Sequence, residues 1–129
     1  MGEAKKPIVV MDDSEIVLET LRAVLEQQGL TVSTAINLAE LETHLAASPP
    51  DLVVLDVQMP EVFGHDVGLV LKQVRKLRVP ILLFSGLDDA VLAEHVQEAE
   101  LDGYVSKNGG VGALLERVTT LLMLQPKVA

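Results

Sequence analysis

Short apolar runs alternate with longer amphipathic stretches along the whole chain. The runs are rich in β-branched residues and predict strands over 8–11, 30–35, 52–55, 79–84 and 103–106. The stretches between them carry apolar residues at helical spacing and predict helices over 14–28, 37–47, 65–77, 88–98 and 111–124. Strands that are apolar almost throughout are typical of a parallel sheet covered on both faces. The alternation therefore predicts an α/β fold with helices on both sides of a five-stranded sheet.

The third predicted helix, 65–77, combines an apolar face with a basic end. Four aliphatic residues recur at helical spacing and are expected on one inward face: Val67, Val70, Leu71 and Val74. Four cations follow late in the same segment: Lys72, Arg75, Lys76 and Arg78. Because cations favour the negative end of a helix dipole, we expect this cluster to complement the helix C-terminus rather than to bind nucleic acid.

Polar side chains stand where the predicted strands end. Asp12 and Asp13 follow the first strand, Asp56 the third, Ser85 the fourth and Lys107 the fifth. The carboxyl ends of parallel strands are where open α/β sheets bind ligands, so these groups are expected to converge. Carboxylates that lie close together are costly unless a cation holds them, and their oxygens suit Mg²⁺. The pattern predicts a metal site beside a reactive Asp56, with donors suited to a phosphate.

Composition narrows the class of protein. The 129 residues fit one domain, and no apolar stretch approaches the ~18 residues that a membrane span requires. The net charge of −9 and the aromatic content of 2% argue against general nucleic-acid binding. There is no cysteine, which excludes disulfides and thiolate metal sites. We expect a cytoplasmic protein that neither enters a membrane nor binds nucleic acid.

Each candidate residue also has a purely structural interpretation. Asp12 and Asp13 could cap a helix, Asp56 could be a turn residue, and Lys107 could be a surface lysine. Taken together, however, the ordered motifs on five predicted strands resemble the receiver domain of two-component response regulators. The resemblance covers about residues 6–122 and rests on Asp12-Asp13, Leu55-Asp56-Val57-Gln58-Met59-Pro60, Gly64, Phe84-Ser85-Gly86 and Tyr104-Val105-Ser106-Lys107.

The resemblance implies a fold and a phosphorylation site. The fold would be flavodoxin-like and doubly wound, with strand order 2-1-3-4-5, five helices and one receiver domain over 1–129, its core at about 6–124. Asp56 would accept a phosphoryl group from a histidine kinase or a phosphotransfer protein. Mg²⁺ would be bound directly by Asp13, Asp56 and the backbone carbonyl of Gln58, and mostly through water by Asp12.

The remaining implied residues read out the modification. Lys107 would pair with the carboxylate and then with the phosphoryl group, and Ser85 would move to bond a phosphoryl oxygen. Tyr104 would then turn inward and change the surface of the fourth helix, fifth strand and fifth helix, a population shift between two states. The domain would catalyse only its own phosphoryl transfer and autodephosphorylation. Its partner would be an effector protein or an effector domain in a longer chain, and a phosphorylation-dependent homodimer is also compatible.

Alternatives remain open at this point. A pseudo-receiver would keep the fold as an interaction module that needs no phosphorylation. An aspartyl phosphatase would need a second acid two residues after Asp56, where Gln58 stands. Asn108 follows Lys107 where many receivers have a cis proline, and a cis bond here would cost about 2.5–4 kcal/mol, so we expect a trans peptide. His44, His65 and His95 lack metal-ligand spacing and receive no role.

Overall fold

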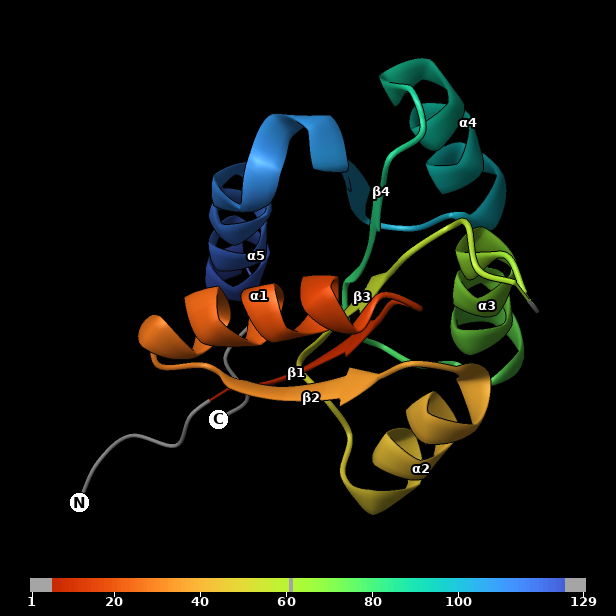
Figure 1. Ribbon diagram of the computed structural model, residues 1–129. Helices are drawn as coiled ribbons and strands as arrows, with labels where there is room; N and C mark the ends of the chain where they lie inside the picture. Colours follow the sequence, from red (N-terminus) through yellow and green to blue (C-terminus); the bar gives the residue numbers. More distant parts are fainter. Residues whose placement is uncertain (1–5, 61, 125–129) are drawn as a thin grey trace.

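A five-stranded parallel sheet forms the centre of the computed structural model, which describes residues 6–60 and 62–124 (Figure 1). The strand order is β2-β1-β3-β4-β5, which confirms the predicted doubly wound topology. The strands are β1 (Pro7–Met11), β2 (Thr31–Ala35), β3 (Leu52–Leu55), β4 (Ile81–Ser85) and β5 (Gly103–Ser106).

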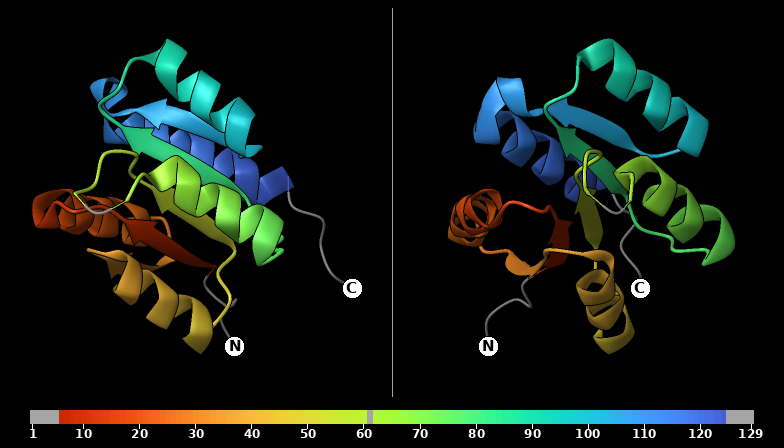
Figure 2. Two further views of the ribbon diagram at one scale, coloured as in Figure 1. Left: turned by 90° about the vertical axis from the view of Figure 1, so that its right-hand side faces the viewer. Right: turned by 45° about the vertical axis from the view of Figure 1, so that its right-hand side comes forward.

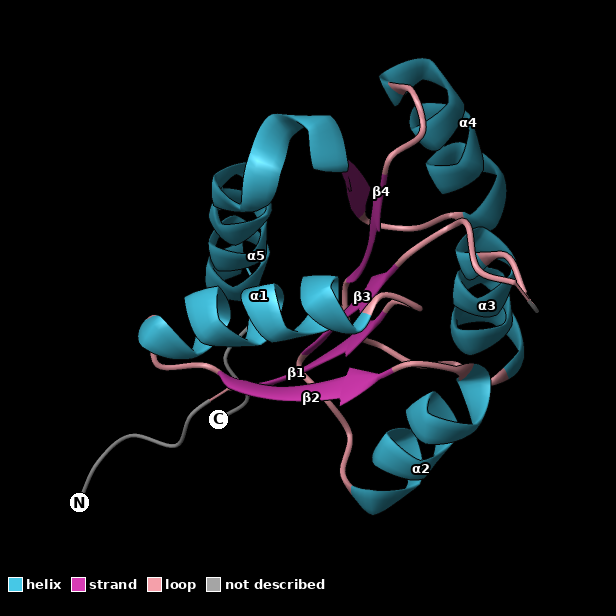
Figure 3. Ribbon diagram, in the orientation of Figure 1, coloured by secondary structure: helices cyan, strands magenta, loops and turns pink. Residues whose placement is uncertain are grey.

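Helices cover both faces of the sheet (Figures 2 and 3). They are α1 (Glu15–Gln27), α2 (Leu38–Ala47), α3 (Gly64–Leu69), α4 (Asp89–Ala99) and α5 (Gly110–Leu124). One core cluster joins α1 and α5 to strand residues such as Ile8 and Val10, and a second joins α2, α3 and α4 to Val9 and Met11. Successive residues of β1 therefore point into opposite cores, which is why its sequence is apolar throughout. Among the described residues, no helix combines the length and the hydrophobicity needed to cross a membrane.

The register brings the carboxyl ends of the central strands to one edge. Met11 of β1 pairs with Leu55 of β3, and Leu55 pairs with Leu83 of β4. Ser85 is the last residue of β4 and lies opposite Ser106 of β5. The segments that follow β1, β3, β4 and β5 therefore begin beside one another, as expected for a ligand-binding edge.

The third helix departs from the prediction in its second half. After α3, residues Val70–Val74 form a π-helix, and the backbone N–H of Arg75 donates to the carbonyl of Val70 at 2.9 Å. The wider i→i+5 turn changes which residues share a face. Val67 and Leu71 are buried, but Val70 and Val74 are 44% and 72% exposed. The expectation that all four residues face inward is therefore wrong for Val70 and Val74.

Two cations of the basic cluster at the end of this segment form ion pairs with other elements. Lys72 Nζ lies 2.8 Å from Asp102 Oδ2, and the Arg75 guanidinium pairs with Glu42 of α2. Both carboxylates belong to other parts of the fold. These two cations therefore join neighbouring elements, and Lys72 also stands in the last turn of its own helix, where a cation was expected.

Candidate functional site

Three carboxylates converge at the carboxyl edge of the sheet. Each of Asp12, Asp13 and Asp56 offers a carboxylate oxygen, and these oxygens all lie within 4.8 Å of one another. Asp12 and Asp56 are buried, with 1% and 4% of their surface exposed, while Asp13 is exposed. A set of hard oxygen ligands with one open side fits a divalent cation that keeps part of its water shell.

Local hydrogen bonds orient the two buried carboxylates. The backbone N–H of Ser14 donates to Asp12 Oδ1 at 2.9 Å, and that of Gln58 donates to Asp56 Oδ1 at 3.3 Å. Asp12 thus turns the chain from β1 into α1, where Ser14 is the N-cap. Asp56 performs the equivalent turn after β3. The second oxygen of each carboxylate faces Lys107 Nζ, at 2.8 Å from Asp12 Oδ2 and 3.7 Å from Asp56 Oδ2.

Asp56 is held in an environment that favours its protonated form. Burial is the main cause that raises its pKa, and the negative charge of Asp12 raises it further. Lys107 and the backbone N–H of Gln58 act in the opposite direction. An ionised Asp56 is therefore poorly solvated, and a cation at the acidic cluster would stabilise it.

Lys107 reaches this cluster from the end of β5, an edge strand of the sheet. Its Nζ donates to Asp12 Oδ2 at 2.8 Å and lies 3.7 Å from Asp56 Oδ2. The side chain crosses the ring of Phe84, with Nζ 5.8 Å from the ring centroid. Lys107 begins a short 3-10 helix, Lys107–Gly109, which Ser106 caps by accepting a hydrogen bond at its Oγ from the N–H of Asn108 at 3.1 Å. None of the peptide bonds in the described part of the chain is cis, so the expectation of a trans Lys107–Asn108 bond is confirmed.

Ser85 supplies a hydroxyl without a partner at the same edge. It is fully buried, and its Oγ makes no hydrogen bond. A buried hydroxyl in this state costs on the order of 1–3 kcal/mol, so such groups usually have a partner. Since β4 adjoins β3, the hydroxyl lies on the strand next to Asp56. An incoming group with free acceptor oxygens would satisfy it.

Gly64 allows the chain after Asp56 to fold back onto the site. Its N–H donates to the carbonyl of Val57 at 3.1 Å, which starts α3 beside the end of β3. A Cβ at this position would stand 1.9 Å from the carbonyl oxygen of Asp56. Any side chain here would displace the backbone of Asp56, so glycine is required by close approach.

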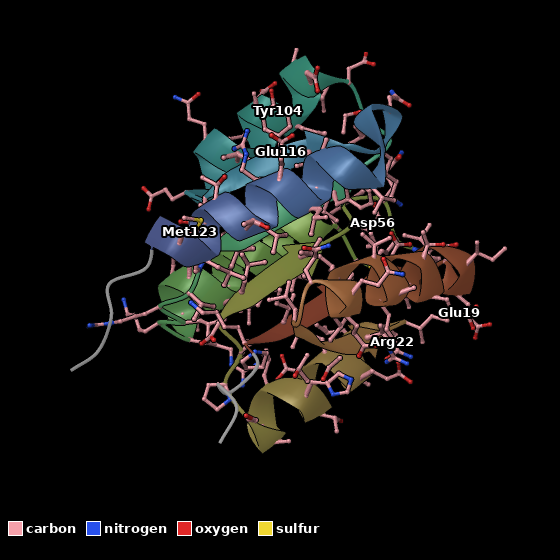
Figure 4. The ribbon with its side chains drawn as sticks, turned by 90° about the vertical axis from the view of Figure 1, so that its left-hand side faces the viewer. Glu19, Arg22, Asp56, Tyr104, Glu116 and Met123 are labelled. Atoms are coloured by element: carbon pink, nitrogen blue, oxygen red, sulfur yellow. The ribbon has the colours of Figure 1, made fainter. Side chains whose placement is uncertain are left out.

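Tyr104 lies apart from the carboxylates, on β5 (Figure 4). It is half-buried and lines a surface groove of about 740 Å³ with Asp88, Glu116 and Arg117. The groove extends over the start of α4, β5 and α5. The structure thus brings Asp12, Asp13, Asp56 and Lys107 into one cluster, places Ser85 on the adjacent strand and leaves Tyr104 on an outer surface.

One pair of interacting side chains was not predicted from the sequence. The rings of His65 in α3 and His95 in α4 stack in parallel, with centroids 3.8 Å apart and an interplanar angle of 10°. The two residues lie in different helices and follow no recognisable spacing. Only the tertiary packing of α3 on α4 brings them together.

Comparison with known proteins shows one family along almost the entire chain. The profile of the response regulator receiver domain matches residues 8–119. The transcriptional regulatory protein PhoP for alkaline phosphatase synthesis in Bacillus subtilis (strain 168) is 34% identical over 87% of this chain and 49% of its own length. The polar-differentiation response regulator DivK of Brucella ovis is 27% identical over 91% of this chain and 96% of its own length. The chain spans about half the length of PhoP and of two other transcriptional regulators that it matches.

Solved structures agree with these relatives. The BeF3-activated receiver domain of DrrB, a Thermotoga maritima response regulator, superposes with a TM-score of 0.81 at 28% identity, covering 93% of this chain and 99% of that one. The residues matched by the family profile, 8–119, include all of the sheet except the first residue of β1. The chain belongs to the response regulator receiver domain family.

Proposed function

We propose that this chain is a phosphoacceptor receiver in which Asp56 takes a phosphoryl group from the phosphohistidine of a histidine kinase or a phosphotransfer protein. One observation carries the proposal. Asp56 is a buried carboxylate that shares its surroundings with two further carboxylates and a lysine, with Lys107 Nζ 3.7 Å from its Oδ2. A buried charge cluster of this kind is costly in the resting protein and suits a reaction that delivers phosphate and metal together.

The proposed reaction is a single displacement at phosphorus. An oxygen of Asp56 attacks, a P–O bond to Asp56 forms, the P–N bond of the donor breaks, and the leaving imidazole takes up a proton. Bound Mg²⁺ would neutralise charge on the transferring group. We assign its direct ligands to Asp13, Asp56 and the carbonyl of Gln58, with Asp12 acting through water.

Two further residues would receive the product. Lys107 already contacts both buried carboxylates, so a small movement would bring its ammonium onto a phosphoryl oxygen. The unpartnered hydroxyl of Ser85 would donate to another oxygen. The same site, with water as acceptor, would support autodephosphorylation, and we propose no other substrate for the domain.

The output would pass through the groove of α4, β5 and α5. If Ser85 moves toward the phosphoryl group, the space it leaves is available to Tyr104, whose side chain now lines the groove. Turning Tyr104 inward would reshape a surface that also carries Asp88, Glu116 and Arg117. An effector protein, an effector domain in a longer chain or a second receiver would read this change. We place one receiver domain over the chain, acting in the cytoplasm.

The test is a chemical phosphorylation assay. Purified wild-type protein and Asp56→Asn would be incubated with Mg²⁺ and acetyl phosphate or the cognate kinase, and the intact mass recorded. We expect one added phosphoryl group on the wild type, none on Asp56→Asn, and none on the wild type when EDTA replaces Mg²⁺. A wild type that gains no mass with either donor would overturn the proposal and favour a pseudo-receiver.

A further inference from the structure

Two imidazoles form a stacked pair between α3 and α4. His65 stands in the first turn of α3 and His95 in the middle of α4, with ring centroids 3.8 Å apart. Phe63 extends the cluster, with its ring centroid 5.7 Å from that of His65. Gly68 of α3 packs closely against Leu101, which lies just beyond the end of α4. The contact is so close that a Cβ on Gly68 would stand 2.8 Å from Leu101 Cδ2. The histidine pair is thus part of a close helix–helix contact.

The pair is suited to neutral imidazoles only. The Nδ1 atoms of both rings are buried and make no hydrogen bond. In a neutral ring with its proton on Nε2, Nδ1 is an acceptor, and leaving a neutral acceptor unpaired costs less than leaving a charged donor unpaired. Protonation would place an N–H donor at the same buried position without a partner and would set two positive rings in stacking contact.

The charges around His65 do not offset this cost. Burial lowers the pKa of His65, and His95 lowers it further, while Asp66 and Glu98 act in the opposite direction. Asp66 Oδ1 lies 3.7 Å from His65 Nε2, but its side chain is 63% exposed, so water screens it. These are the charged groups that act on His65 from α3 and from α4.

The location links the pair to the phosphorylation site. His65 directly follows Gly64, whose Cα lies against the Asp56 carbonyl. His95 belongs to α4, which begins shortly after Ser85 and borders the groove with Tyr104. The contact between the rings therefore joins the helix behind Asp56 to the helix that forms the output surface.

We propose that His65 and His95 are a positioning pair that holds α4 against α3 while the His65 ring is neutral, and that a proton on His65 releases α4 and favours the activated state. The link to Asp56 rests on the function proposed above. Activation and acid would then act in the same direction: displacement of α4 separates the rings, and a separated His65 ring binds a proton more readily. The position of α4 would then respond to mild acidity as well as to phosphorylation.

The resting protein provides the first test. The imidazole C–H signals of wild type, His95→Phe and the control His44→Gln would be followed by NMR from pH 5 to pH 8. The control removes a histidine outside the pair, whose Nε2 donates to the Thr34 carbonyl at 2.8 Å. We expect His65 to titrate below its ordinary 6.5, with backbone signals of α4 following the same midpoint. Phenylalanine keeps a stacked ring and removes one charge, so the His65 midpoint should rise in His95→Phe and stay unchanged in His44→Gln.

Any one of three results would overturn the proposed role of the pair. These are a His65 midpoint at or above 6.5, α4 signals that do not change with the His65 titration, and equal His65 midpoints in wild type and His95→Phe. If His95→Phe fails to fold, His95→Gln serves for the same comparison, and the wild-type titration stands by itself.

The second test concerns the link to activation. Beryllofluoride with Mg²⁺, a mimic of the phosphoryl group, should raise the His65 midpoint in the wild type and leave it unchanged in Asp56→Asn. Site signals that respond to beryllofluoride while the His65 midpoint stays fixed would overturn the coupling. If beryllofluoride perturbs no signal at all, the proposed function fails, while the resting titration still decides the pair.

Discussion

Asp56 has surroundings that suit the proposed phosphorylation but make its ionised form unfavourable in the folded protein. Its pKa is raised in the folded protein, chiefly by burial and then by Asp12. A carboxyl group whose folded-state pKa is raised contributes stability below its unfolded value, and that contribution is lost as the pH rises through the folded value. At neutral pH in the absence of metal, an ionised Asp56 therefore lowers the free energy of unfolding.

Asp56→Asn should consequently be more stable than wild type at pH 7 in magnesium-free buffer. Each unit by which the pKa is raised corresponds to about 1.4 kcal/mol, and the gain should shrink as the pH falls through the raised folded-state pKa and be absent below about 3.8. Urea unfolding at several pH values measures this difference. Glu94→Gln, at an exposed position of α4, is the matched control and should change little. A less stable Asp56→Asn at neutral pH would contradict the argument.

Ser85 and Ser106 offer a second comparison at this scale, because they are paired across β4 and β5. Ser85 Oγ is buried without a partner, whereas Ser106 Oγ accepts a hydrogen bond from the N–H of Asn108. Ser85→Ala should therefore leave the free energy of unfolding unchanged or raise it, while Ser106→Ala should lower it by about 1 kcal/mol. Ser85→Ala should nevertheless weaken the response to beryllofluoride. A loss of more than about 1 kcal/mol in Ser85→Ala would show that its hydroxyl has a partner in solution.

At the scale of elements, the strands were the most predictable part. β3 is apolar throughout and bounded by Pro50 and Asp56, so its pattern depends little on the rest of the fold. The acids were predictable for the same reason, since they stand where such runs end. The helix of residues 65–77 was not, because a period of 3.6 cannot reveal that Val70–Val74 adopt i→i+5 bonding. The stack of His65 on His95 was also hidden, because it depends on how two helices pack.

The π-helix leads to a contrast between two aliphatic positions. Leu71 is 2% exposed and belongs to the core shared with α2 and α4, whereas Val74 is 72% exposed. Leu71→Ala should lower the free energy of unfolding by about 2–5 kcal/mol, and Val74→Ala should change it by less than about 0.5 kcal/mol. Chemical denaturation of both variants measures the difference. Similar losses at the two positions would mean that Val74 faces the sheet, as the regular helical period predicts.

At the scale of the molecule, the site exists only when the sheet is complete. Asp12 follows β1, Asp56 follows β3, and Lys107 follows β5, yet Lys107 Nζ lies 2.8 Å from Asp12 Oδ2. No short segment of the chain contains this arrangement. A ligand that needs it binds the folded protein and not the unfolded chain, so binding must raise the stability of the whole domain.

Magnesium that binds the acidic cluster should therefore raise the temperature of thermal unfolding, and the rise should grow with the logarithm of its concentration above the dissociation constant. At 100 times its dissociation constant, a ligand selective for the folded state adds about 2.7 kcal/mol, which is large against a typical domain stability of about 5–15 kcal/mol. Asp13→Asn removes the exposed carboxylate of the cluster without disturbing a buried contact, so it should keep the fold and lose most of the magnesium-dependent rise in Tm. Glu116→Gln removes the same charge from the exposed face of α5 and should keep that rise. Equal responses in the two variants would attribute the stabilisation to general screening of the net charge of −9 rather than to the carboxylates at the strand ends.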